Sequence, residues 1–275
     1  MQLKTVLLDN QPIALCVAGP ISLVTQLHDV VYVIFGSTHS TVARFSASTH
    51  QRLADINVEG LIHPLDMVAC EQTSQLYIAD SEECVWRLSP DGADMKRWLP
   101  RSSSDRSIRP YSLSVTSGNL LVTAKSTQEL RQFDADGNQL RTIRLPDNVM
   151  PLQCVESPAG TFIVSHRKRH GTTFQVSEVN SDGQALRQFT GSRLTPFNLL
   201  LAANVATDSR GNIFVADVYK SRVLLLDAHL QLRRVIIDED RLNDNQPLRL
   251  KYVEQYGQLL VGMWNGFAHF DVLLR

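Results

Sequence analysis

The sequence lacks several features that would assign it to a class at once. Its 275 residues include four cysteines, Cys16, Cys70, Cys84 and Cys154, none of them in Cys-x-x-Cys spacing. No apolar run is long enough to span a bilayer, and no Asn-x-Ser/Thr sequon occurs. A formal net charge of −1 gives no general attraction to DNA, RNA or an anionic membrane. We therefore expect a cytoplasmic protein with reduced, mostly buried thiols and with no membrane or DNA partner.

The common motifs of metal-binding and catalytic sites are also missing. The eight histidines are dispersed, and no clustered Cys/His spacing of a zinc site occurs. His166 and His170 are four residues apart, but they fall in an expected loop, where this spacing does not bring them together. No Gly-x-Ser-x-Gly elbow and no phosphate-binding glycine loop is present. We expect no cofactor and no metal, and an enzyme is the less favoured interpretation.

The sequence is rich in short apolar runs that end in turn-forming residues. Examples are "VVYVIFG" (30–36), "LLVTAK" (120–125), "TFIVSH" (161–166) and "QLLVGM" (258–263). Runs of this length, rich in Val, Ile, Leu and Phe, predict strands, since helices need longer stretches with a spacing of three to four residues. Turn sequences such as "PDG", "ADG" and "SDG" separate the strands. The pattern predicts an all-β fold.

A hairpin sequence occurs twice, and weaker copies of it fill the rest of the chain. The two clear copies are "LYIADSEECVWRLSPDG" (76–92) and "IFVADVYKSRVLLLDAH" (213–229). Six units align on the residue that ends the second strand of each: Gly36, Asp80, Lys125, His166, Asp217 and Trp264. Their entries are Pro20, Pro64, Pro110, Pro151, Leu201 and Pro247, at intervals of 41 to 50 residues. A period in the forties with about four strands per unit predicts one domain over 1–275, a six-bladed β-propeller.

The last unit indicates how the ring closes. Only three strands follow Pro247, so the fourth strand of this blade must come from the N-terminus. Either "LKTVLL" (3–8) or "IALCV" (13–17) can supply it, and we favour 3–8. Closure of this kind pairs edges that would otherwise be exposed.

The units resemble the NHL repeat. The resemblance is carried best by residues 63–92, "HPLDMVACEQTSQLYIADSEECVWRLSPDG", and by residues 203–229. It covers essentially the whole chain, and it implies an NHL-type propeller like those of TRIM-type and related metazoan NHL proteins. Such propellers serve as protein-binding platforms or RNA-binding domains, and related propellers are metal-dependent lyases or lactonases. The aspartate of the Ala-Asp pair is absent from the other four units.

Strand order places one set of side chains on a common face. In an antiparallel blade, the loop after the second strand and the loop that enters the next blade lie at the same end. We expect a binding platform for a protein or peptide there, formed by Asp80, Glu82, Lys125, His166, Arg167, Arg169, Asp217, Tyr219 and Trp264. Alternatively, Asp80 and Asp217 cap their own turns, with Asp217 paired to Arg222, and Trp264 packs against a neighbouring blade. Trp86 and Trp98 are expected in the core.

Two further functions stay open. An RNA-binding propeller would use the basic loops of units three to five, with Lys125, Arg167, Lys168, Arg169 and Lys220, although Glu82 and Glu83 interrupt this positive charge. A metal-dependent lactonase or lyase would need several oxygen ligands at the channel mouth. The residues two positions after each entry are Ser22, Asp66, Ser112, Gln153, Ala203 and Arg249. Asn204 directly follows Ala203. These positions offer one carboxylate, one nearby amide and an arginine, a set that disfavours a metal-dependent enzyme.

Overall fold

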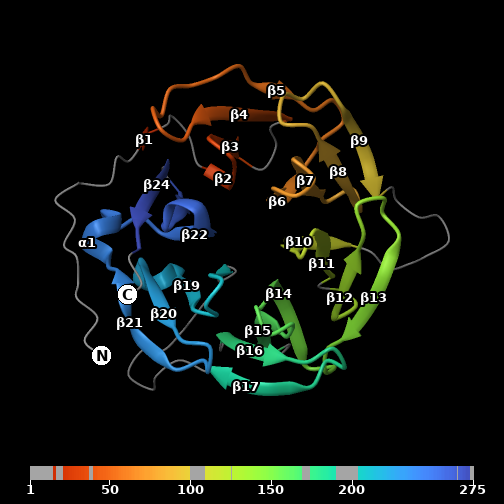
Figure 1. Ribbon diagram of the computed structural model, residues 1–275, viewed down its shortest axis with the longest axis vertical. Coiled ribbons are helices and arrows are strands. Elements are labelled where there is room, and N and C mark those ends of the chain that lie inside the picture. The colour runs from red at the N-terminus through yellow and green to blue at the C-terminus, as the bar shows by residue number, and fades with distance from the viewer. Residues whose placement is uncertain are drawn as a thin grey trace.

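The chain forms a ring of six antiparallel sheets (Figure 1). The computed structural model describes residues 15–16, 21–36, 40–99, 109–124, 126–168, 174–189, 204–264 and 266–272. Over these residues each sheet has four strands, and helix is confined to α1 (Glu239–Leu242) and two 3-10 turns, Val218–Lys220 and Glu254–Tyr256. No helix in the described part of the chain is long and apolar enough to cross a membrane. The predicted all-β, six-bladed propeller is confirmed.

Each blade is a meander that runs from the innermost strand to the outermost. Blade one has β2 (Ile21–Leu27), β3 (Val30–Phe35), β4 (Thr41–Ser46) and β5 (Ile56–Asn57). Blade two has β6 (Pro64–Cys70), β7 (Gln75–Asp80), β8 (Cys84–Leu88) and β9 (Met95–Leu99). Blade three has β10 (Pro110–Thr116), β11 (Asn119–Ala124), β12 (Glu129–Phe133) and β13 (Gln139–Arg144).

The second half of the ring follows the same order. Blade four has β14 (Val149–Glu156), β15 (Phe162–Lys168), β16 (Phe174–Val179) and β17 (Ala185–Phe189). Blade five has β18 (Val205–Thr207), β19 (Ile213–Asp217), β20 (Arg222–Leu226) and β21 (Leu232–Ile237). Blade six has β22 (Pro247–Val253), β23 (Gln258–Met263), β24 (Gly266–Asp271) and, outermost, β1 (Leu15–Cys16).

The N-terminal segment closes the ring, as the strand count predicts. Leu15 pairs with Phe267 and Cys16 with Gly266, so β1 completes blade six. This strand lies within 13–17 and not within the favoured segment 3–8, which is outside the described residues. Innermost β2 starts five residues after Cys16. Their reach of about 17 Å covers the roughly 14 Å across a four-stranded blade, so a strand as late as Leu15–Cys16 can still close the ring.

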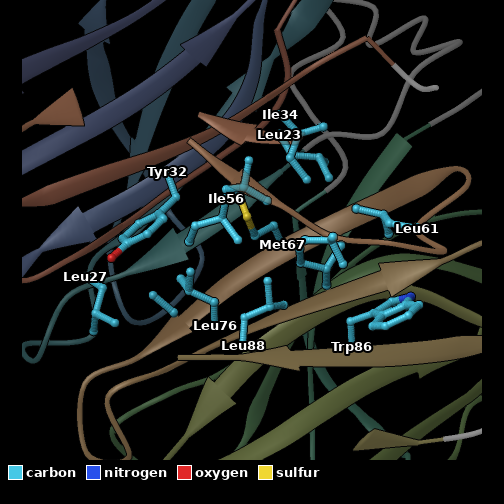
Figure 2. Close-up of a cluster of buried hydrophobic side chains, with 14 of the residues drawn as sticks. Leu23, Leu27, Tyr32, Ile34, Ile56, Leu61, Met67, Leu76, Trp86 and Leu88 are labelled. Atoms are coloured by element: carbon cyan, nitrogen blue, oxygen red, sulfur yellow. The ribbon is translucent and has the colours of Figure 1, made fainter. Parts of the chain in front are cut away.

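The core lies between neighbouring blades, because each sheet packs both its faces on others. Figure 2 shows this packing between blades one and two, with side chains that include Leu23, Tyr32, Ile34, Met67, Leu76, Trp86 and Leu88. Burial on both faces explains why the middle strands are continuously apolar rather than alternating. Trp86 and Trp98 are buried, as predicted. Cys70, Cys84 and Cys154 are buried free thiols, again as predicted.

Candidate functional site

The innermost strands bring six chain segments to one central channel. Their register shows that each strand begins where the second strand of its blade ends, since Pro64 pairs with Asp80 and Pro151 with His166. Pro247 likewise pairs with Met263. The channel mouth and the loops after the second strands therefore share one side, which we call the loop face. This agrees with the strand-order prediction.

A cavity of about 160 Å³ lies at the channel mouth on the loop face. Its apolar wall comes from Leu23, Pro64, Leu65, Tyr111 and Leu152, and its polar side chains are Asp66, Ser112, Gln153, Asn204 and Arg249. In four blades a bulge separates the entry proline from the polar residue two positions later. An inserted residue re-aims the side chain that follows it. In these four blades the bulge thus directs a polar side chain towards the channel, whereas blade one contributes the apolar Leu23.

Most of these polar side chains bind the backbone of the next blade. The Leu113 N–H donates to Asp66 Oδ2 at 2.8 Å, and the Val205 N–H donates to Gln153 Oε1 at 2.6 Å. The Leu250 N–H donates to Asn204 Oδ1 at 2.7 Å. Each bond links a blade to its neighbour in the ring, so these acceptors have a structural role and cannot also serve as freely available ligands.

The third of these bonds corrects the alignment of unit five. The repeat spacing places Ala203 two residues after the entry of unit five, the position of Asp66 and Gln153 in their own blades. In the structure it is Asn204 that makes the corresponding bond to the next blade. Unit five therefore runs one residue later than its assigned entry at Leu201. The entry lacks a proline, which removed the usual marker. The similarity of "NVAT" to "DMVA" was the available signal.

Arg249 reaches from blade six across the channel mouth to blade two. Its Nη2 donates to the Leu65 carbonyl at 2.9 Å, and its Nε lies 3.3 Å from Asp66 Oδ1. Asp66 also accepts from the Met67 N–H at 3.0 Å. Burial raises the pKa of Asp66, and the charge of Arg249 is the strongest opposing influence. The one carboxylate that lines this cavity is therefore held in an ion pair.

The channel mouth does not fit a resident metal ion. No group of three or more His, Cys, Asp or Glu side chains that could hold a metal occurs among the described residues. A hard cation needs six or more oxygen ligands, and here side-chain oxygens of Asp66, Gln153 and Asn204 already accept backbone N–H groups, while the Ser112 hydroxyl accepts none from the described residues. The guanidinium of Arg249 also places a positive charge beside the carboxylate.

Three of the predicted partner-binding residues lie below the surface. Asp80 is buried and accepts from the Ile62 and His63 N–H groups at 3.1 and 3.0 Å, which fixes the loop that enters blade two. Asp217 is buried and accepts from Arg222 Nε at 2.8 Å, the pair expected as an alternative. His166 is buried and contacts Ser177 Oγ at 2.8 Å. These three side chains lie at the ends of strands that neighbouring blades cover. The structure therefore does not support direct contact between them and a partner.

Other predicted residues are accessible on the loop face. Trp264 is 54% exposed and Tyr219 is 41% exposed, on adjacent blades. Packing of Trp264 against a neighbouring blade, the alternative for this residue, is therefore wrong. Glu82 is exposed, and Arg167 is partly exposed, with its Nε 3.3 Å from Met150 Sδ. Lys125 and Arg169 lie outside the described residues.

One accessible residue of the loop face was not anticipated. Ile62, in the loop that enters blade two, is 44% exposed. Its position two residues before the entry proline Pro64 was the signal that could have placed it on this face.

The comparisons with known proteins support the fold. No protein-family model and no curated protein matches the chain. A putative gluconolactonase structure has a TM-score of 0.71 at 11% identity, covering 95% of this chain and 91% of that one. The structure of a virginiamycin B lyase from Staphylococcus aureus, a catalytically inactive variant with quinupristin, has a TM-score of 0.62 at 11% identity. The match covers 92% of this chain and 80% of that one. The nidogen/laminin complex structure has a TM-score of 0.60 at 15% identity, and the match covers 80% of this chain and 81% of that one. The comparisons thus confirm the six-bladed propeller that the NHL resemblance implies but do not show the NHL family, and the neighbours include proteins named as a lyase and as a putative lactonase.

Proposed function

We propose that this propeller is a non-catalytic platform that binds a protein or peptide on its loop face. The observation that carries the proposal is the exposure of two large aromatic side chains, Trp264 and Tyr219, on adjacent blades of this face. Aromatic residues dominate the binding energy of protein interfaces because they bury a large area with few rotatable bonds. Exposed singly they would need no explanation, but here both lie on the face that holds the channel mouth.

The turn that carries Tyr219 is held in place before any partner arrives. Tyr219 belongs to the 3-10 turn Val218–Lys220, and the Asp217–Arg222 ion pair of 2.8 Å joins the two strands on either side of it. Ser221 Oγ donates to the Asp244 carbonyl at 3.4 Å, which ties the turn to the segment that enters blade six. A surface fixed in this way loses little conformational entropy on binding.

A metal-dependent lyase or lactonase is the second candidate, and the named neighbours favour it. The gluconolactonase and virginiamycin B lyase structures share the ring of this chain. Against it stands the Asp66–Arg249 pair, which takes the carboxylate that a channel-mouth metal would require. RNA binding has less support, because the exposed Glu82 repels phosphate on this face and the partly buried Glu83 pairs with the basic Arg109 at 2.7 Å.

A peptide array tests the platform against a matched control. The purified chain is applied to an array of unrelated peptides, and the peptides that bind are titrated in solution. Trp264→Ala and Tyr219→Ala should each weaken binding about tenfold or more. Tyr256→Ala is the control, because Tyr256 is 45% exposed but lies at the turn between β22 and β23, on the opposite face. Equal loss in all three variants, or no loss in any, would contradict the proposal.

The other two functions give distinct results in parallel assays. Hydrolysis of gluconolactone that requires added Ca²⁺ or Mg²⁺ and disappears in Asp66→Asn would establish the enzyme instead. Binding to unrelated RNAs that falls steeply with salt, and that survives Trp264→Ala, would establish RNA recognition.

A further inference from the structure

The channel holds a second cavity on the far side of the Asp66–Arg249 pair, which we call the lower chamber. It has a volume of about 150 Å³, and every blade contributes to it through its innermost strand. It shares Asp66, Gln153, Asn204 and Arg249 with the channel mouth. Away from the loop face it is lined by other polar side chains, among them Thr25, Ser114, Glu156, Thr207, Lys251 and Tyr252.

Lys251 is partly exposed and gives the lower chamber a positive charge with no carboxylate in direct contact. Within the described residues no carboxylate lies within ion-pair distance of its ammonium group, whereas ten other ion pairs occur there. Burial lowers the pKa of Lys251, and the charge of Glu71 opposes this effect. A cation that lines a cavity is stabilised by an anion that enters the cavity.

Three further polar atoms of the chamber lining have no hydrogen-bond partner among the described residues. These are the Ser114 hydroxyl, on a side chain 6% exposed, Glu156 Oε2, and Arg249 Nε, which lies in the ion pair with Asp66. The other carboxylate oxygen of Glu156, Oε1, lies 3.5 Å from Arg141 Nη2. Buried polar atoms in native proteins nearly always have a partner, and each exception needs an explanation. Here the exceptions line the same cavity as the unpaired lysine.

We propose that the lower chamber binds a small carboxylic acid that also carries a hydroxyl or ammonium group. The ligand carboxylate meets Lys251, its hydroxyl or ammonium group donates to Glu156 Oε2, and the Ser114 hydroxyl bonds to either end. At about 30 Å³ for each water in the liquid, the chamber has the volume of roughly five waters. This size suits an acid such as lactate or serine and excludes nucleotides and sugar chains. The site is independent of the loop face and of the function proposed for it.

Calorimetric titration of the full chain with four probe compounds tests the proposal. L-lactate and L-serine should bind, acetate should bind more weakly because it lacks the second group, and propylammonium should not bind. Lys251→Met keeps the length of the side chain and removes the charge, so it should weaken lactate and serine binding about tenfold or more. Lys96→Met is the matched control, because Lys96 is an exposed lysine on the outer strand β9, and it should bind as the parent does.

A second variant keeps the test decisive if Lys251→Met fails to fold. Ser114→Ala removes one hydroxyl that has no partner in the described structure, so the fold should be unaffected while lactate and serine binding weakens. Two results would overturn the proposal. One is that neither lactate nor serine binds the parent in the millimolar range. The other is that the folded variants bind them as tightly as the parent.

Discussion

Replacing Arg249 by Met should destabilise the protein strongly, because it leaves the charge of Asp66 buried and unpaired. Asp66 is 3% exposed, and two backbone N–H groups, those of Leu113 and Met67, remain its donors in the variant. Removing one partner of a buried ion pair costs about 3–5 kcal/mol. The methionine retains most of the apolar volume of the arginine stem, so the loss reports on charge rather than on a cavity.

The loss of stability in Arg249→Met should depend on pH, and the burial of Asp66 determines the direction of this dependence. Burial already raises the pKa of Asp66 above its unfolded value, which is about 4. A raised folded pKa means that the native state binds the proton more tightly, so stability falls as pH rises from the unfolded pKa to the folded pKa. Without Arg249 the pKa rises further. The difference between variant and parent should therefore be small near pH 4 and grow towards neutral pH.

Urea unfolding followed by tryptophan fluorescence at acid and neutral pH measures both effects. Arg52→Met is the control, because Arg52 also pairs with an aspartate, Asp55 at 2.8 Å, but is 55% exposed. Exposed pairs contribute about 1 kcal/mol or less. The double variant Asp66→Asn with Arg249→Met should recover part of the loss, since no buried charge is left. A loss at Arg249 no greater than that at Arg52, or one that does not change with pH, would refute the reasoning.

Four further outcomes test the fold. Deleting residues 1–16 removes β1 and exposes the edge of β24, so light scattering should show aggregation, whereas deleting 1–10 should leave a soluble chain with cooperative melting. Aggregation of the 1–10 deletion as well would place the closing strand in 3–8. Gly262→Ala would put a Cβ into Cγ1 of Val24, with an expected loss of about 1–3 kcal/mol in chemical denaturation, and a neutral effect would contradict the packing of blade six on blade one. Burial lowers the pKa of His166 to about 4, so stability should be lost as pH falls from about 6.5 towards 4, and melting of His166→Gln should show a shallower pH dependence. Burial also raises the pKa of Cys84 to about 11, so this thiol should react with thiol reagents only after denaturation, and rapid reaction of the native chain would show that it is accessible.

The sequence by itself determined the architecture, because the blade is a local unit. Each hairpin is recognisable from its own sequence, as short apolar runs separated by a turn. Six copies at intervals of forty to fifty residues are compatible with few folds other than a propeller. The pairing of Asp217 with Arg222 could also be predicted from the sequence, since the two residues lie at opposite ends of one turn. The choice between 3–8 and 13–17 as closing strand could not be predicted, because both are short apolar runs and only the pairing of Leu15 and Cys16 with β24 distinguishes them.

The site was decided by the tertiary structure. Asp80 and His166 look like loop residues in the sequence, yet packing between blades buries them, while Trp264, which follows the equivalent position Met263 in blade six, is exposed. Arg249 and Asp66 are far apart in the chain and in non-adjacent blades, and they meet only because the closed ring brings the start of every innermost strand to one narrow channel. The unpaired Lys251 and Ser114 share a cavity for the same reason. A repeat pattern fixes where each strand begins, but the width of the channel, and therefore which side chains can reach across it, depends on how all six blades pack together.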